Sequence, residues 1–277
     1  MNSIYHFFKE IYKLRNNFLT DEKLENFPFP TDMISCVNRG SFPDLAIKLN
    51  SGRSLFTGGE LIELKDSDSY NVSSFNSTIP TGKKEISKII KGENSSIKRQ
   101  METAGDDINS LEVREIFYLV RGKRNDNRKV VLVHGSFFET VGYSSLISSS
   151  FSQVFEEMLI QSNIKISDDI KKLITQLKSE QENFSKVREV EKASVKLRFR
   201  IMTEVNAEGN ILNTEKYPEI QDNTINFILP KHSEKELKTI QEKFEYVFDG
   251  NSRKAFTSID LKHHYNGYFR VYQAKLI

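Results

Sequence analysis

Two segments near the middle of the chain constrain its fold most. VREIFYLVRG (residues 113–122) and KVVLVHGSFF (residues 129–138) are rich in β-branched and aromatic residues. The stretch between them, RGKRNDNRK, is polar and basic, as is typical of a turn. These segments give the strongest strand signals in the sequence, and they predict a β-sheet at the centre of the fold.

The rest of the chain alternates between helical and strand patterns. Apolar residues three and four apart predict a helix over residues 4–18, and strands are predicted at 44–49 and in SLFTGGELIELK, with Gly58-Gly59 as a kink or bulge. The fold class is therefore mixed α/β (α+β), with a central mixed sheet flanked by helices. The remaining predictions are helices at 144–161, 166–190 and 232–250, and strands at 195–205, in TINFILP, in AFTSIDL and in GYFRVYQAKLI.

The composition excludes several classes of protein. The chain has 277 residues, 38% of them hydrophobic and 28% charged, which is ordinary for a globular protein with a sizeable core. No window of 18 apolar residues and no compact apolar leader are present, so neither a membrane span nor a signal peptide is expected. A single cysteine, Cys36, excludes an intramolecular disulfide and a cysteine-based zinc site. We therefore expect an intracellular protein.

The most informative polar residues lie on the two strands predicted at 44–49 and in ELIELK. Successive strand residues alternate between faces, so Glu63 and Lys65 share one face while Leu64 points the other way. If Asp44 heads a neighbouring antiparallel strand, its carboxylate lies at the same edge. The carbonyl of Leu64 lies between the Glu63 and Lys65 positions. By the same alternation, Glu60 and Asp66 point away from this set, and Asp68 lies where the strand ends.

This set of groups suits the hydrolysis of a phosphodiester. Two carboxylates and a backbone carbonyl supply the hard oxygen ligands that Mg²⁺ prefers. A bound metal can acidify a water molecule and offset charge on the scissile phosphate. Lys65 can orient that water or help to deprotonate it. The net charge of +2 says little about partners, but a local basic face is sufficient to bind a polyanion.

The order Pro43-Asp44, eighteen residues, Glu63-Leu64-Lys65 resembles the PD-(D/E)xK nucleases, and among them the type II restriction endonucleases. The segment at 73–84 is similar to one that follows the catalytic lysine in several restriction enzymes. The resemblance implies a restriction-endonuclease-like core and a site-specific deoxyribonuclease acting on double-stranded DNA. In that reading Asp44, Glu63 and the Leu64 carbonyl bind one or two Mg²⁺ ions, and Lys65 assists the attacking water.

Further expectations follow from this resemblance. By analogy the enzyme is a homodimer in the cytoplasm of a prokaryotic cell. Residues 1–277 are expected to form a single nuclease domain, with its catalytic core at roughly 1–160 and with 161–277 serving DNA recognition or dimerisation. Glu10 and Glu22 are candidates for a further acid on a helix. The candidate DNA contacts, which are polar or basic and follow the catalytic strand, are Ser67, Tyr70, Asn71, Asn76, Ser77, Thr78, Lys83 and Lys84.

Several alternatives are weighed against this interpretation. The chain has no G-x-S-x-G elbow, P-loop or Rossmann fingerprint, which argues against a serine hydrolase and a nucleotide cofactor. His134 is expected at the edge of the core, and the adjacent His263 and His264 face opposite sides of a strand. The basic run at 121–129 is either a phosphate contact or a solvated surface. A PD-(D/E)xK nuclease of repair or recombination and a non-catalytic nucleic-acid-binding protein remain alternative functions.

Overall fold

The computed structural model describes residues 3–37, 42–49, 58–70, 72, 82–90, 96–103, 105, 111–138, 157, 161, 187–188, 194–195 and 211–277. The chain divides into two compact units. The larger is formed by residues 1–73, 79–140 and 206–277, and the smaller by residues 74–78 and 141–205. In the smaller unit, β7 (Val187–Arg188) pairs antiparallel with β8 (Ser194–Val195).

The larger unit is built around one mixed sheet. Among the described residues it has nine strands in the order β1-β2-β3-β5-β6-β9-β11-β10, with β4 paired to β5. The pairs β3–β5 and β6–β9 are parallel and the others are antiparallel. The bounds are β1 (Ile34–Val37), β2 (Leu45–Ile47), β3 (Leu61–Ser67), β4 (Lys83–Glu85), β5 (Val113–Arg124), β6 (Asn127–His134), β9 (Thr224–Lys231), β10 (Thr257–His263) and β11 (Gly267–Lys275).

The predicted pair of central strands is confirmed as β5 and β6. They pair antiparallel from Phe117 opposite His134 to Arg124 opposite Asn127. The turn between them contains Asn125 at φ 55°, a left-handed conformation that asparagine adopts more readily than most residues. The second strand is shorter than predicted, because the chain turns into the 3₁₀ helix η3 (Gly135–Phe138) after His134.

The helices agree with the sequence pattern in place more than in length. The helix predicted over residues 4–18 is broken into α1 (Ser3–Lys13) and α2 (Asn17–Thr20). The helix predicted at 232–250 is α7 (Glu234–Val247), which Ser233 caps by accepting the Glu236 N–H. Gly250 begins α8 (Gly250–Arg253) and does not end α7. The other helices are η1 (Leu24–Asn26), α3 (Ile86–Ile89) and α4 (Ser96–Thr103).

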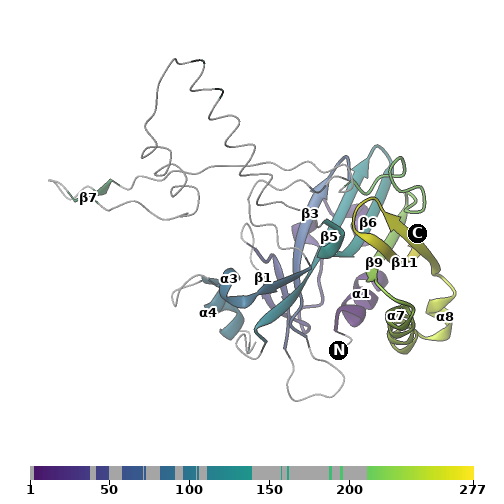
Figure 1. Ribbon diagram of the computed structural model, residues 1–277, viewed down its shortest axis with the longest axis horizontal. Helices are drawn as coiled ribbons and strands as arrows, with labels where there is room; N and C mark the ends of the chain where they lie inside the picture. Colours follow the sequence, from purple (N-terminus) through teal and green to yellow (C-terminus); the bar gives the residue numbers. More distant parts are fainter. Residues whose placement is uncertain are drawn as a thin grey trace. The chain divides into compact units, whose positions relative to one another are not determined.

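The sheet separates two hydrophobic cores. The helices α1 and α7 cover the face that we call the α1 face, where Phe117 and Leu119 of β5 are buried (Figure 1). The opposite face, called the α4 face, buries Ile116 and Tyr118 of β5 together with residues of α3, α4 and η3. The alternation along β5 therefore sorts its side chains between two distinct cores.

Three of the described strands were not predicted: β1, β4 and β7, and β7 lies inside the helix predicted at 166–190. Most of the predicted helices at 144–161 and 166–190 and most of the predicted strand at 195–205 lie outside the described residues; residues 187–188, which are described, form a strand and not the predicted helix. The division into a core at 1–160 and a second part at 161–277 stays a prediction, although the sheet takes strands from both parts. None of the described helices is long and apolar enough to cross a membrane.

Candidate active site

The predicted acids meet where the pairing of β2 with β3 ends. These strands are antiparallel neighbours, as predicted, with Leu45 opposite Ile62. Asp44 directly precedes β2, and its Oδ2 accepts the backbone N–H of Leu64 at 2.8 Å. The carboxylate thus continues the hydrogen bonding of the ladder by one step and is fixed beside residues 63–65.

Glycine fixes the return of the chain into β3. Gly58 has φ +62° and Gly59 has φ +95°, a region that residues with a Cβ rarely adopt. A Cβ on Gly58 would lie 1.7 Å from the carbonyl oxygen of Lys48. The kink predicted at these glycines is therefore confirmed, and the close approach of the two segments depends on it.

Glu63 and Lys65 lie on the α4 face beside Asp44. Glu63 stands opposite Tyr118 of the parallel strand β5, whose ring belongs to the core of that face. The Lys65 Nζ donates to Glu63 Oε1 at 2.7 Å. The other oxygen of Glu63, Oε2, is buried and has no hydrogen-bond partner among the residues that the structure describes. All three predicted catalytic side chains are therefore brought together.

The electrostatics of the site appear in the pKa of Asp44. Burial and the negative charge of Glu63 raise this pKa to about 6, against an ordinary value of 3.8. The Leu64 N–H and the charge of Lys65 act in the opposite direction. Burial and the neighbouring Glu63 charge outweigh these two effects, because two carboxylates share a half-buried site with Lys65.

The donor set fits a hard divalent cation. The N–H and C=O of a strand residue point to the same edge, so the carbonyl of Leu64 faces the side on which Asp44 accepts its N–H. Two carboxylates and one carbonyl are then available, and the unpartnered Glu63 Oε2 is one of their oxygens. Within the described ranges, no three His, Cys, Asp or Glu side chains come together to bind a metal. A site with only two carboxylates and a carbonyl suits Mg²⁺, because this ion keeps several waters as ligands.

Glu60 and Asp66, which point away from Glu63 and Lys65, stabilise the fold. The hydroxyl of Ser3 donates to Glu60 Oε2 at 2.6 Å, so this carboxyl links the residue before β3 to α1, and its burial raises its pKa. Asp66 pairs with the buried Arg121, whose Nε and Nη2 donate at 2.7 and 2.9 Å. Burial alone would raise the pKa of Asp66, but the hydrogen bonds from Arg121 and the Leu24 N–H hold it below its usual value.

The same arginine fixes a segment that carries a third acid. Arg121 also donates to the carbonyls of Asp21 and Glu22 at 2.7 and 3.2 Å, directly before η1. Glu25 lies in η1, and its charge contributes to the raised pKa of Asp44. Sequence reasoning considered Glu10 and Glu22 and missed Glu25, because no pattern in the sequence marks it. Glu10 instead pairs with Lys13 on α1 at 2.7 Å.

The candidate DNA contacts fall into three groups. Asn71, Asn76, Ser77 and Thr78 lie outside the described residues. Ser67 ends β3, and Lys83 and Lys84 lie on β4. Tyr70 is buried, with its ring packed against Gly122 and the Lys129 ammonium 4.7 Å from its centroid. A contact between Tyr70 and DNA would require this packing to open.

The basic run at 121–129 is neither a surface patch nor a phosphate clamp as a whole. Arg121 and Lys129 are fully buried, and Lys129 pairs with Asp222 at 3.1 Å. Lys123 donates to the carbonyls of Asp21 and Glu22. Three cations of the run, Arg121, Lys123 and Lys129, therefore fix polar groups of neighbouring segments.

The histidines have the structural roles expected of them. Burial lowers the pKa of His134 to about 4, and its Nδ1 lies 2.7 Å from the Ser136 hydroxyl. His263 is buried, and its Nδ1 accepts the N–H groups of Tyr265 and Asn266, whereas His264 is exposed. The two adjacent rings therefore face opposite sides, as predicted.

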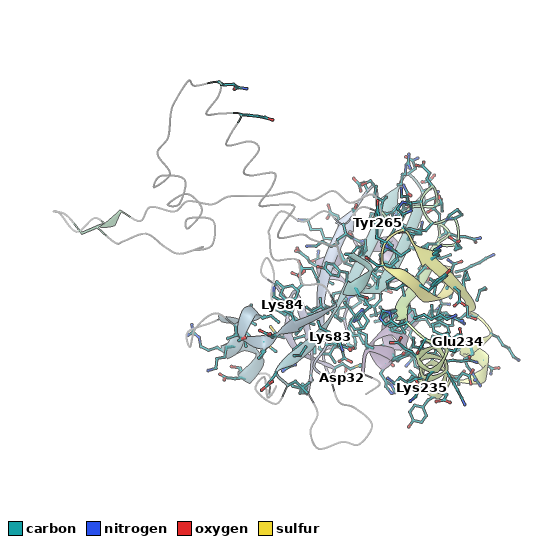
Figure 2. The ribbon with its side chains drawn as sticks, viewed as in Figure 1. Asp32, Lys83, Lys84, Glu234, Lys235 and Tyr265 are labelled. Atoms are coloured by element: carbon teal, nitrogen blue, oxygen red, sulfur yellow. The ribbon has the colours of Figure 1, made fainter. Side chains whose placement is uncertain are left out.

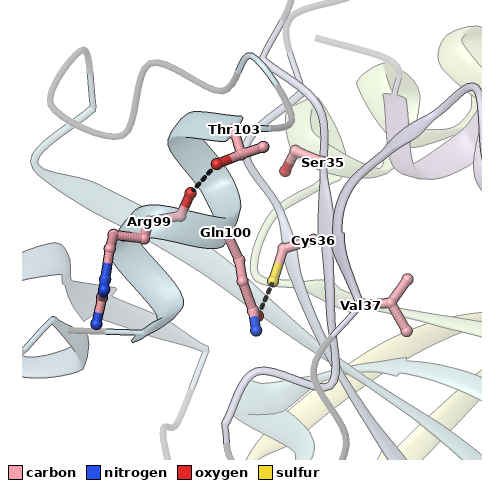
Figure 3. Close-up of a pocket in the computed structure, with 6 residues that line it drawn as sticks. All are labelled: Ser35, Cys36, Val37, Arg99, Gln100 and Thr103. Atoms are coloured by element: carbon pink, nitrogen blue, oxygen red, sulfur yellow. Dashed lines mark hydrogen bonds between the residues drawn. The ribbon is translucent and has the colours of Figure 1, made fainter.

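A separate open hollow of about 460 Å³ lies between β1 and α4 (Figure 3). The Cys36 thiol donates to Gln100 Oε1 at 3.4 Å across it. The side chain of Arg99 extends away from β1 (Figure 3). Its lining residues are Ser35, Cys36, Val37, Arg99, Gln100 and Thr103.

Comparison of the chain with protein-family models, with curated proteins and with solved structures finds no match to any of them.

Proposed function

We propose that this chain is a metal-dependent endonuclease of the PD-(D/E)xK type that hydrolyses phosphodiester bonds of double-stranded DNA, most like a type II restriction enzyme. One observation carries the proposal. Asp44, the residue before β2, accepts the Leu64 N–H at 2.8 Å, which brings its carboxylate to the Glu63–Lys65 pair just beyond the paired part of β2 and β3. Burying two carboxylates side by side costs free energy, so this arrangement is not expected of a surface hairpin whose charges are simply solvated.

Asp44, Glu63 and the Leu64 carbonyl would hold the metal. When bound there, a divalent cation supplies positive charge against the two carboxylates and the phosphate, and it lowers the pKa of nearby water. The raised pKa of Asp44 supports this role, because the two acids lack sufficient counter-charge in the protein alone.

Lys65 would act on the attacking water and on the phosphate. Its ammonium is held by Glu63 Oε1 at 2.7 Å, so its position relative to both acids is set before substrate arrives. From there it can donate a hydrogen bond to a phosphate oxygen, or take up a proton from the water if it is deprotonated. In either role, pre-organisation by Glu63 reduces the reorientation required at the moment of reaction.

The experiment is the incubation of supercoiled plasmid and linear DNA with the protein and Mg²⁺. Discrete fragments would support a site-specific endonuclease. Lys65→Ala should lower the cleavage rate by about 10²–10⁴-fold, the range expected for loss of a positioned acid–base group. Binding of duplex DNA should change little, because Lys65 is one of several cations.

The matched control is Glu10→Ala, which removes an acid that is paired with Lys13 on α1 and stands outside the site. This variant should cut at the wild-type rate. If the wild-type protein leaves DNA intact in Mg²⁺ and Mn²⁺, or if Lys65→Ala cuts as fast as the wild type, the proposed function is wrong.

A further inference from the structure

Two adjacent lysines on the short strand β4 have different surroundings. β4 pairs antiparallel with β5, with Lys84 opposite Arg114 and Lys83 opposite Glu115. Neighbouring strand residues point to opposite faces of a sheet, whereas directly paired residues point to the same face. The two lysines, labelled in Figure 2, are thus sorted to opposite sides of the sheet.

Lys84 is on the face that carries the candidate active site. Its partner Arg114 has the parity of Ile116 and Tyr118, which belong to the core of the α4 face. Glu63 stands opposite Tyr118 in the parallel pair β3–β5 and so lies on that face as well. Lys83 has the other parity, its side chain is 67% exposed, and it is 3.9 Å from Glu115.

The ammonium of Lys84 is also held in place. It lies over the ring of Phe42, 5.5 Å from the centroid, and Phe42 packs against the core of the α4 face. A cation held on an aromatic face keeps its charge and loses part of its rotamer freedom in advance of binding. Phe42 precedes Asp44 by two residues, a separation of at most roughly 7 Å between Cα atoms.

We propose that Lys84 binds a backbone phosphate of the DNA next to the one that is cut, and that Lys83 does not. This inference rests on the proposed function. It distinguishes Lys84 from Lys83, whereas the sequence pattern predicted both lysines as DNA contacts. Asp44 and Glu63 repel the DNA backbone, so a cation on the same face of the sheet, held over the ring of Phe42, offsets part of that repulsion along the substrate strand. Such a contact positions the substrate without reading its sequence.

The test compares Lys84→Gln with Lys83→Gln, which remove the same charge from adjacent positions. Binding of a fluorescent duplex is measured by anisotropy, with EDTA present so that no cleavage occurs, at several salt concentrations. Lys84→Gln should bind about three- to tenfold more weakly at 0.1 M salt, and the slope of log K against log salt should fall by about 0.9. Lys83→Gln should match the wild type, and Lys84→Arg should restore most of the affinity.

The outcomes separate this inference from the proposed function. If the wild type binds and cuts DNA but Lys84→Gln binds as tightly as the wild type, or no more weakly than Lys83→Gln, the inference about Lys84 is wrong and the nuclease assignment stands. If the wild type binds without cutting, the nuclease assignment fails, and the comparison of variants still decides the role of Lys84. A wild-type protein that neither binds nor cuts DNA overturns both. Equal melting temperatures among the variants confirm that the change is not a loss of folding.

Discussion

Replacing Asp44 by asparagine should make the metal-free protein more stable while it abolishes cleavage. The asparagine oxygen can still accept the Leu64 N–H that Asp44 accepts at 2.8 Å, so the local geometry is kept. What is lost is a negative charge that is buried beside Glu63. A residue whose removal stabilises the fold is one whose placement serves something other than folding.

The size of this effect follows from the pKa. A pKa of about 6 against an ordinary 3.8 corresponds to roughly 3 kcal/mol at about 1.4 kcal/mol per pKa unit. Asp44 is only half-buried, so solvent screening reduces this to about 1 kcal/mol. Because its pKa is raised in the folded state, Asp44 favours folding at low pH, and this contribution is lost as the pH rises through 6.

The assay is thermal unfolding of both proteins in EDTA at pH 4.5 and pH 8. Relative to the wild type, the free energy of unfolding of Asp44→Asn should be about 1 kcal/mol higher at pH 8 than at pH 4.5. This corresponds to a shift of roughly 3 °C in Tm. Added Mg²⁺ should raise the Tm of the wild type more than that of the variant, since only the intact acid pair binds the ion well. A variant less stable than the wild type at pH 8, or a difference that does not change with pH, would refute the reasoning.

Two more substitutions test the framework that holds the site. Gly58→Ala should destabilise the protein by more than about 3 kcal/mol in chemical denaturation, because the new Cβ would collide with a backbone oxygen. Gly105→Ala has a similar φ of +81°, but no described atom lies within 4 Å of the new Cβ, so it should cost only about 1–2 kcal/mol. Equal losses in the two variants would show that the clash at Gly58 is relieved. Arg121→Met should cost about 3–5 kcal/mol, since Asp66 loses its bidentate partner. The exposed Arg253→Met is its control, and a comparable loss there would contradict this account.

Much of the core of the site was predictable from residue order. The alternation along ELIELK placed Glu63 and Lys65 on one face, and the turn signals placed Asp44 on a neighbouring strand. Both follow from local rules that the structure respects, because each strand has a buried face that fixes its register. The central strands β5 and β6 were predictable for the same reason.

Other features depend on contacts that no local pattern carries. The residues of β4, Lys-Lys-Glu, show no strand preference, and the strand exists because its backbone pairs with the start of β5. The break between α1 and α2 lies inside a continuous helical pattern. Glu25 lies near Asp44 in a segment that Arg121 and Lys123, about a hundred residues away in the sequence, hold through the carbonyls of Asp21 and Glu22.

The parallel pairing of β6 with β9 has a consequence for how the chain is made. The side-chain amide of Asn226 in β9 donates to the carbonyl of Val130 in β6, which is 96 residues earlier in the sequence. At about 5–20 residues per second, a ribosome needs roughly 5–20 seconds to synthesise the stretch between them. During that interval the nascent chain holds β1 to β6 with one edge of β6 still unpaired, and such an edge can recruit another chain. We therefore expect the emerging protein to depend on chaperones until β9 to β11 leave the ribosome and complete the sheet.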